Sequence, residues 1–504
     1  MKVILTVVLV LALLLSWLWF WTVLEKPVPA VSEESAEVRE DTIRVWVNEL
    51  LTSPDEAFYY ELADCWNATH PSVKIKMSVM AHAGYESKLR VAIASGQPPD
   101  VALGGLSTLE TLRYTGKSTN LGVSIPEEFF PRERLEEMGP IVEAAIVRDG
   151  RPTVYPVYRY CYGGVILANR RMLQEAGFDD ERIRRDGWTY EDFLQAAKKM
   201  TQDLDGDGTP DVWGFGAALV HLDHLFLREF GPGAWGKDLT ESFFAWNERV
   251  KRWDVNPNLK EEHFLEVLRL FDRMFHKEKV WNPLLLGMDW NEIINELVVR
   301  ERLGMTFGET PWVVKLRKEI WETEVRQGVR TGEPPDMTVL WMPTLKPGDR
   351  PVPQAGVLGF SIMKQAPYKG DAHTDNAIRV ALFLTHPVLL ARSQLRQFRH
   401  LPPEPLRFEK IYPELIDNDD PWVRFYNEIM DSEVPLVIRP KGMDTPDLER
   451  FHLLTNEFDR WFRKEGVEYI QQVVYGKLLP EEAAKRLREG LGELPEKVYS
   501  EEDR

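Results

Sequence analysis

The sequence predicts an α/β protein of two lobes, and three features lead to this expectation. The chain has 504 residues, which is longer than the range in which one hydrophobic core usually stays undivided. Strand-like and helix-like stretches alternate from Thr42 onward. Residues 151–200 then read as a strand, a crossing, a second strand and a helix, the order expected where a chain passes from one lobe into another.

The first lobe is expected to open with a βαβ unit. Residues 42–47 and 73–79 have the composition and alternation of strands. Residues 54–67 between them have helical spacing, which predicts that Phe58 and Cys65 face inward.

Candidate ligand contacts follow from this arrangement, because open α/β sheets bind ligands outside the carboxyl ends of their strands. Asn48 and Glu49 come after the first strand, while Gly105 and Ser107 come at and after the end of a later one. The alternative is that these residues only build turns.

The stretch 155–169 is rich in aromatic and β-branched residues and should be extended. Pro156 and the glycine pair at 163–164 break it into two pieces, which fits a sheet edge or a hinge between lobes.

A helix is predicted to begin after Thr189. Thr189 is a favourable N-cap, and Asp192 stands three residues further on. Trp188 is placed to pack onto Phe193, as in a hydrophobic staple.

Four short motifs in this order resemble the family 1 extracellular solute-binding proteins, the group that contains maltose-binding protein. They occupy residues 153–156, 169–172, 175–177 and 188–193, and one departure is Ala168, where the family usually has Tyr. The resemblance implies a two-lobed periplasmic-binding-protein fold of type II, with a mixed sheet flanked by helices in each lobe and three hinge crossings.

The implied domain organisation has three parts. Residues 1–40 form an N-terminal signal or anchor segment and a tether. Residues 41–158 with 355–410 form the first lobe, and residues 159–354 with 411–504 form the second.

The resemblance also implies further ligand-binding residues. Residues 302–312 resemble the family pattern "G.aAM...gpW", in which Trp312 would stack on a sugar ring from the second lobe. The family often has Trp where Val357 or Leu358 stands here, so one stacking surface is absent or moved. The other candidates come from the first crossing, from the second lobe and from the return to the first lobe: Tyr158, Arg159, Tyr160, Tyr162, His221, Asp223 and Gly356. The alternatives are a core position for Trp312, and an ordinary surface position or metal ligation for His221 and Asp223.

Composition and motifs narrow the class of function. A formal net charge of -18 argues against nucleic-acid binding, which needs clustered basic residues. No nucleophile elbow, phosphate loop or metalloprotease motif occurs, and the GxGxxG match at 231–236 is expected to be a turn because no strand precedes it.

The resemblance therefore implies a non-enzymatic protein that binds an oligosaccharide or similar polyol, needs no cofactor, and presents its ligand to the permease subunits of an ABC transporter. A membrane-tethered sugar sensor is the alternative, and a glycan-acting enzyme is a third reading.

The N-terminal segment points to a location outside the cytoplasm. Lys2 precedes about 22 apolar residues, enough to span a bilayer. Tryptophans near its outer end favour a retained anchor, whereas small residues at 28–30 favour a cleaved signal. The two cysteines, Cys65 and Cys161, are expected to be buried free thiols rather than a disulfide.

An acidic loop in the second lobe has the spacing of a calcium site. Aspartates stand at its positions 1, 3, 5 and 9, with a backbone carbonyl at position 7. Position 12 is Gly214 instead of Glu, so affinity should be lower than in an EF-hand, and the alternative is an Asp-rich turn. The predicted ligands of a structural Ca²⁺ are Asp203, Asp205, Asp207, Thr209 and Asp211.

Overall fold

A computed structural model describes most of the chain after residue 39. The described residues are 40–49, 54–81, 85–105, 123–148, 151–162, 164–218, 222–241, 243–288, 292–307, 311–365, 367–398, 424–425, 428–429, 434–435 and 445–501. The chain divides into two compact units, Met1–Asp41 and Thr42–Arg504. The predicted membrane segment lies outside the described residues, and within them no helix has the length and apolar character needed to cross a bilayer.

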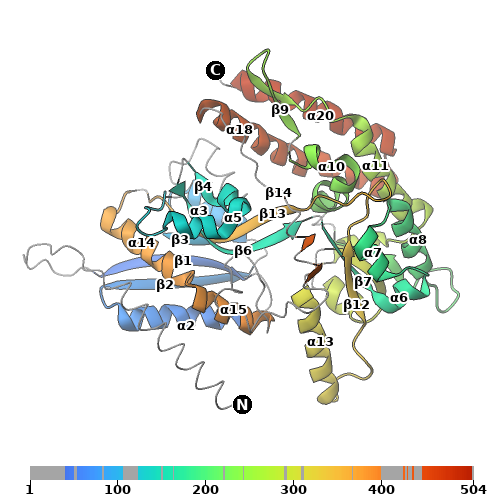
Figure 1. Cartoon of the computed structure of the whole chain (residues 1–504), viewed down its shortest axis with the longest axis horizontal. Coiled ribbons are helices and arrows are strands. Elements are labelled where there is room, and N and C mark those ends of the chain that lie inside the picture. The colour runs from blue at the N-terminus through green and yellow to red at the C-terminus, as the bar shows by residue number, and fades with distance from the viewer. Residues whose placement is uncertain are drawn as a thin grey trace, which may run out of the picture. The chain divides into compact units, whose positions relative to one another are not determined.

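The first sheet has six strands that come from distant parts of the chain (Figure 1). Its order is β14-β13-β3-β1-β2, and β6 also pairs with β13. β1 runs parallel to β3, whereas β13 runs antiparallel to both β3 and β6, so the sheet is mixed as predicted. The strands are β1 (Asp41–Glu49), β2 (Val73–Ala81), β3 (Val101–Gly105), β6 (Val154–Tyr162), β13 (Gln354–Ile362) and β14 (Val434–Pro435).

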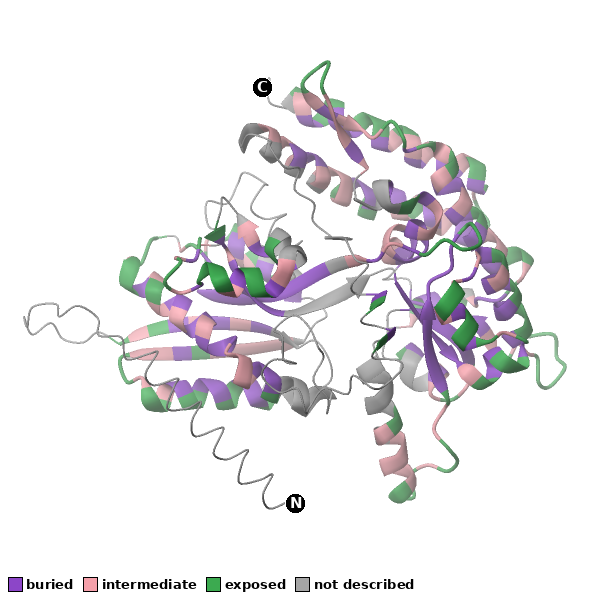
Figure 2. Cartoon of the chain, in the orientation of Figure 1, coloured by how far each residue is buried: buried purple, intermediate pink, exposed green. Residues whose placement is uncertain are grey.

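Alternation along β1 explains why this sheet forms. Ile43, Val45 and Val47 are fully buried, and Arg44 and Trp46 between them are partly exposed. Figure 2 shows the buried strands of the sheet among helices with exposed outer faces. These helices are α2 (Pro54–Thr69), α3 (Tyr85–Ala94), α5 (Arg132–Ile146), α14 (Asp371–Leu384) and α15 (Pro387–Phe398); a small ribbon is formed by β4 (Val147–Arg148) and β5 (Arg151–Pro152).

The second sheet has four strands in the order β12-β7-β11-β8. Every residue of β7, β11 and β12 is buried, as expected for strands covered on both faces. The strands are β7 (Val165–Asn169), β8 (Trp213–Phe215), β11 (Leu303–Phe307) and β12 (Met337–Trp341). Helices of this region are α6 (Arg170–Glu175), α7 (Asp180–Asp186), α8 (Tyr190–Met200), α9 (Leu222–His224), α10 (Gly231–Glu241), α11 (Glu261–Asp272), α13 (Pro311–Arg326), α18 (Thr445–Trp461), α19 (Val467–Val474) and α20 (Pro480–Glu501).

Helix α8 begins as the sequence predicts. The Thr189 side chain and Asp192 form a reciprocal capping box. The Trp188 and Phe193 rings meet edge to face, with centroids 5.7 Å apart. This local pattern is readable from sequence because both contacts join residues that are close together in the chain.

The glycine-rich stretch 231–236 is helical, which corrects the prediction of a turn. It forms the start of α10, and the helix is kinked at Gly236, which has a φ of 74°. A Cβ at Gly231 would lie 1.9 Å from the Trp235 ring, so glycine is required by packing. The sequence pattern could not show this, because the constraint is a close contact inside the helix.

Several short segments have tighter or wider helical turns than an α-helix. The wider π-type turns are η2 (Leu225–Phe230), η3 (Arg273–Lys277), η5 (Ile293–Val298) and η7 (Phe462–Gly466), and η4 (Pro283–Gly287) is a 3-10 turn. A hairpin of β9 (Phe244–Asn247) and β10 (Arg252–Val255) lies in the same region of the sequence.

Two findings differ from the sequence expectations. Residues 159–162 and β14 pair within the first sheet, although both fall in ranges predicted for the second lobe. Strand pairing joins residues far apart in sequence, so local patterns do not reveal it, and the domain ranges stay a prediction.

Cys65 is exposed on α2 and not buried, while the Cys161 side chain lies outside the described residues.

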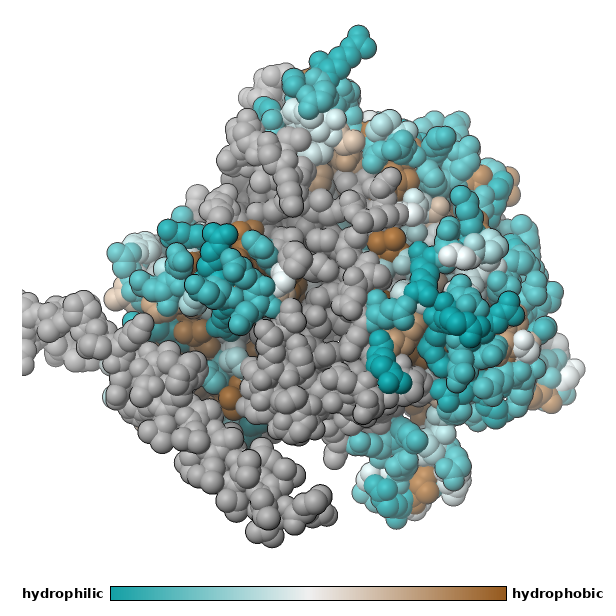
Figure 3. Space-filling view, in the orientation of Figure 1, coloured by the Kyte–Doolittle hydropathy of each residue, from teal (hydrophilic) through white to brown (hydrophobic). Residues whose placement is uncertain are grey.

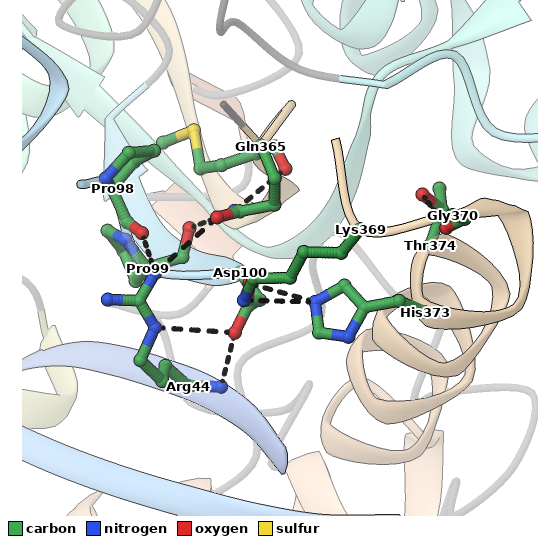
Figure 4. Close-up of polar contacts among 10 residues, drawn as sticks. Arg44, Pro98, Pro99, Asp100, Gln365, Lys369, Gly370, His373 and Thr374 are labelled. Carbon is green, nitrogen blue, oxygen red and sulfur yellow. Dashed lines mark hydrogen bonds and ion pairs between the residues drawn. The ribbon is translucent and has the colours of Figure 1, made fainter. Parts of the chain in front are cut away.

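A buried carboxylate, Asp100, joins β1, β3 and α14 (Figure 4). Its side chain is 1% exposed, and Oδ2 accepts a hydrogen bond of 2.7 Å from the Arg44 backbone N–H. Oδ1 lies 2.8 Å from Lys369 Nζ and 3.0 Å from His373 Nε2. Burial alone would raise the pKa of Asp100, but the hydrogen bonds from His373 and Lys369 outweigh burial and lower the pKa to about 2.

We expect Asp100→Asn to lower the free energy of unfolding by about 2 to 4 kcal/mol at pH 7, because it removes the charge of a buried carboxylate that Arg44, Lys369 and His373 surround. The folded-state pKa lies below the ordinary value of 3.8, so this stabilisation is present above pH 4 and is lost as the pH falls towards about 2.

Urea unfolding of both proteins from pH 7 to pH 2.5 checks this prediction, with the exposed Asp371→Asn as a control. A difference between wild type and Asp100→Asn that stays constant over this range would contradict it.

Candidate functional site

The first sheet brings several predicted ligand positions into one row at an edge. The parallel register pairs Val45 with Val101 and Trp46 with Ala102, so continuing it sets Glu49 beside Gly105. Gly105 in turn pairs with Leu358 of β13. Because β1 and β3 both end here, Asn48, Glu49 and Gly105 lie at the strand ends where α/β sheets bind ligands.

The row continues into the long ribbon of β6 and β13. Tyr158 pairs with Leu358, and Gly356 pairs with Tyr160. Positions alternate between strand faces, so 158, 160 and 162 share one face of β6 and 159 belongs to the other. Four of the predicted residues therefore belong to β6, which pairs with β13 from the level of the end of β3 onward.

A bulge sets the register of this ribbon. The pairing shifts between Leu358, opposite Tyr158, and Gly359, opposite Pro156. A Cβ at Gly359 would lie 2.4 Å from the Tyr155 carbonyl oxygen, so only glycine permits this approach. The bulge adds one residue to β6 between the positions opposite Gly359 and Leu358, so it sets the pairing of every later position in β6.

In the second sheet too, predicted positions follow the carboxyl ends of two parallel strands. β8 and β11 are parallel, with Leu303 opposite Trp213 and Met305 opposite Phe215. The Thr306 hydroxyl donates a 2.8 Å hydrogen bond to the Gly216 carbonyl, which holds the two strands together at their carboxyl ends. His221 and Asp223 follow β8, and Trp312 follows β11 as the second residue of α13.

The predicted residues are described to different extents. Asp223 and Gly356 have defined surroundings, with the Asp223 side chain 14% exposed and Gly356 buried. The backbone positions of Asn48, Glu49, Gly105, Tyr158, Arg159, Tyr160, Tyr162 and Trp312 are described. Ser107 and His221 lie outside the described residues.

Sequence reasoning did not single out Arg463. Among the described ion pairs, its guanidinium is one of two groups that approach Asp223, and the other is the imidazole of His224. Arg463 Nη1 lies 3.9 Å from Asp223 Oδ2, and so does His224 Nε2. Arg463 stands 240 positions later in the chain, and no local pattern links the two residues.

In the acidic loop, the Asp203 carboxylate faces backbone N–H groups of the same loop. Asp203 accepts hydrogen bonds of 2.8 Å from the backbone N–H groups of Gly206 and Gly208. Both glycines have positive φ, 78° and 89°, which permits the tight turn. The hydrogen bond from Gly208 contributes most to lowering the pKa of Asp203.

Three of the five predicted calcium ligands come together in this loop. Carboxylate oxygens of Asp203, Asp205 and Asp211 all lie within 4.8 Å of one another, and all three residues are exposed. Hard oxygen donors of this kind suit Ca²⁺. Gly214 at position 12 lies in β8, where a Cβ would meet the Ala197 carbonyl oxygen at 1.8 Å, so this position cannot carry the bidentate Glu of an EF-hand.

The family comparison agrees with the resemblance drawn from the motifs. Residues 48–375 match the model of the bacterial extracellular solute-binding protein family. The chain belongs to this family. No curated protein sequence matches it.

Solved structures share the fold across nearly the whole chain. The maltose/maltodextrin-binding domain from Bdellovibrio bacteriovorus, bound to maltotriose, has a TM-score of 0.60 and 17% identity, covering 91% of this chain and 100% of that one. An ABC transporter solute-binding protein from Thermotoga lettingae, bound with α-D-tagatose, has a TM-score of 0.62 and 17% identity, covering 90% and 100%. A solute-binding protein from Agrobacterium radiobacter in complex with ribitol has a TM-score of 0.60 and 13% identity, covering 91% and 99%. The fold is thus the two-lobed α/β fold predicted from sequence.

We expect calcium to raise the thermal stability of the protein, since an ion that binds only the folded loop stabilises it by about 2.7 kcal/mol at 100 times its Kd. Melting curves with calcium and with chelator measure the effect. Asp205→Ala should abolish it, whereas Glu333→Ala, a change at another exposed acidic residue, should not.

Equal melting temperatures with calcium and chelator would show that the loop is only a turn. Calcium-dependent melting that persists in Asp205→Ala would place the ion elsewhere.

Proposed function

We propose that this protein is an extracytoplasmic solute-binding protein that captures a carbohydrate, an oligosaccharide or similar polyol, between its two lobes and delivers it to an ABC importer. The observation that carries the proposal is the repeated placement of candidate residues after the carboxyl ends of parallel strands. β1 and β3 supply this edge in one sheet, and β8 and β11 supply it in the other.

The chemistry of the candidate residues suits a polyhydroxylated ligand. Indole and phenol rings provide flat apolar faces for the C–H groups of a sugar ring. Carboxylate, guanidinium and imidazole groups can exchange hydrogen bonds with ligand hydroxyls around that ring. The maltotriose, tagatose and ribitol bound by proteins of the same fold belong to this chemical class.

Binding would favour a closed arrangement of the lobes. A ligand between the lobes contacts residues of both sheets only when the lobes close around it. The free energy of these contacts therefore favours the closed arrangement. The β6–β13 ribbon, which includes Tyr158, Tyr160 and Gly356, would supply contacts near the axis of that motion.

We propose that the protein needs no cofactor and carries out no catalytic step. Calcium in the loop containing Asp203, Asp205 and Asp211 would act on stability alone. The N-terminal segment 1–40 would place the mature fold outside the cytoplasm, where the permease subunits of an importer receive the ligand.

Titration calorimetry with maltotriose, D-tagatose and ribitol tests the binding proposal, and coupled uptake in vesicles containing the importer tests delivery. Micromolar or tighter binding of at least one of these compounds, with no turnover on prolonged incubation, is the expected result. Absence of binding across this panel and a wider set of oligosaccharides would refute it.

Trp312→Ala should weaken binding of the carbohydrate by about 2 to 4 kcal/mol, as expected for an aromatic residue that dominates a binding surface. The melting temperature of the free protein should change little. Calorimetry and melting curves of the same variant separate these effects.

Trp321 is a matched control nine residues further along α13. Its indole N–H donates to the Gly332 carbonyl at 3.2 Å, and its ring carries the Arg330 guanidinium at 4.8 Å. Trp321→Ala should leave affinity unchanged. If Trp312→Ala instead lowers the unfolding free energy by about 3 to 5 kcal/mol with unchanged affinity, Trp312 is a core residue.

A further inference from the structure

Asp223 has an unusual combination of burial and charge. Its side chain is 14% exposed, and two basic side chains approach the same oxygen, Oδ2. His224 Nε2 and Arg463 Nη1 are each 3.9 Å away. These distances exceed those of direct hydrogen bonds, so neither contact occupies a lone pair of Oδ2, and the Arg463 guanidinium attracts the carboxylate by its charge.

Two residues that precede Arg463 restrict where its side chain lies, Asp459 and Phe462. The Arg463 Nε–H is shared between the two carboxylate oxygens of Asp459, each 3.0 Å away, in a bifurcated hydrogen bond between side chains that are 49% and 40% exposed. The preceding residue, Phe462, is 1% exposed and begins the π-type turn η7. The half-exposed Arg463 side chain therefore extends from a backbone whose preceding residue is buried in the core.

Phe462 also contacts the segment that carries Asp223. The Phe462 ring stacks on Phe226, with centroids 5.9 Å apart and an angle of 30°. Phe226 is fully buried and lies three residues after Asp223, in the π-type turn η2. This stacked ring pair sets how far the segment around Phe226 lies from the segment around Phe462. It thereby brings Arg463 close to Asp223.

We propose that Arg463 is a positioning residue for ligand binding, which orients the Asp223 carboxylate so that its free lone pairs accept hydrogen bonds from ligand hydroxyls. This inference rests on the proposed carbohydrate-binding function. Arg463 acts through Asp223: the Asp459–Arg463–Asp223 chain of charges restrains the carboxylate before the ligand arrives. Restraining a side chain in its bound conformation raises affinity by lowering the entropy lost on binding.

A double-mutant cycle in the full chain tests the inference, with maltotriose, D-tagatose and ribitol as the titrated compounds. Arg463→Met should raise the Kd of the compound that binds by about 5- to 10-fold, the range of coupling between neighbouring charges. In an Asp223→Asn background the same change should raise Kd less than about 2-fold, because the charged partner is already gone. Arg463→Lys, which keeps the charge, should recover part of the affinity.

Arg460→Met is the matched control. Arg460 lies three residues before Arg463 and pairs with Glu457 at 2.5 Å. Its side chain is 62% exposed, so its removal should change neither Kd nor the melting temperature of the free protein. Arg463→Met should lower the melting temperature only slightly, because the Arg463 side chain is 49% exposed, whereas a large fall with unchanged Kd would indicate a purely structural role.

Each other outcome overturns the inference in a distinguishable way. If wild type binds none of the three compounds or of a wider oligosaccharide set, the proposed function and this inference fail together. If wild type binds and Arg463→Met binds equally well, only the positioning role fails. If Arg463→Met weakens binding by the same factor in the wild-type background and in the Asp223→Asn background, Arg463 acts independently of Asp223.

Discussion

The pairing of β13 with its neighbours is the constraint on which the first sheet depends. β13 exchanges backbone hydrogen bonds with β3 along one edge and with β6 along the other, and β14 adds to its beginning. These pairings join segments near residues 100, 160, 360 and 435 into one surface. Because backbone pairing fixes register, it also decides which positions lie level with the ends of β1 and β3.

Glycine and buried charge maintain that register. Gly359 permits the close approach of the Tyr155 carbonyl at the bulge, so a side chain there would disturb the row of positions beyond it. At the start of β3, Asp100 holds β1 and α14 through the Arg44 backbone, Lys369 and His373. One end of the sheet is therefore fixed by a satisfied carboxylate, and the opposite end carries the candidate ligand positions.

In the second sheet, buried strands and aromatic packing hold the elements together. Its central strands are buried along their whole length, and aromatic packing such as the Phe226–Phe462 stack ties the later helices to them. Figure 3 shows a largely hydrophilic surface over this part of the molecule, in keeping with a net charge of -18.

The sequence by itself determined the features that depend on neighbours within a few residues. The capping box at Thr189, the alternation in β1 and the turns around Gly206 and Gly208 are all local, and the four motifs of the crossing stretch, taken in order, indicated the family. Tertiary structure alone decided the contacts between distant segments: the bulge opposite Tyr158, the place of β14, the helical start at Gly231 and the approach of Arg463 to Asp223. Such contacts depend on how whole elements pack, and packing is set by the combined shape of many side chains, which no short pattern in the chain records.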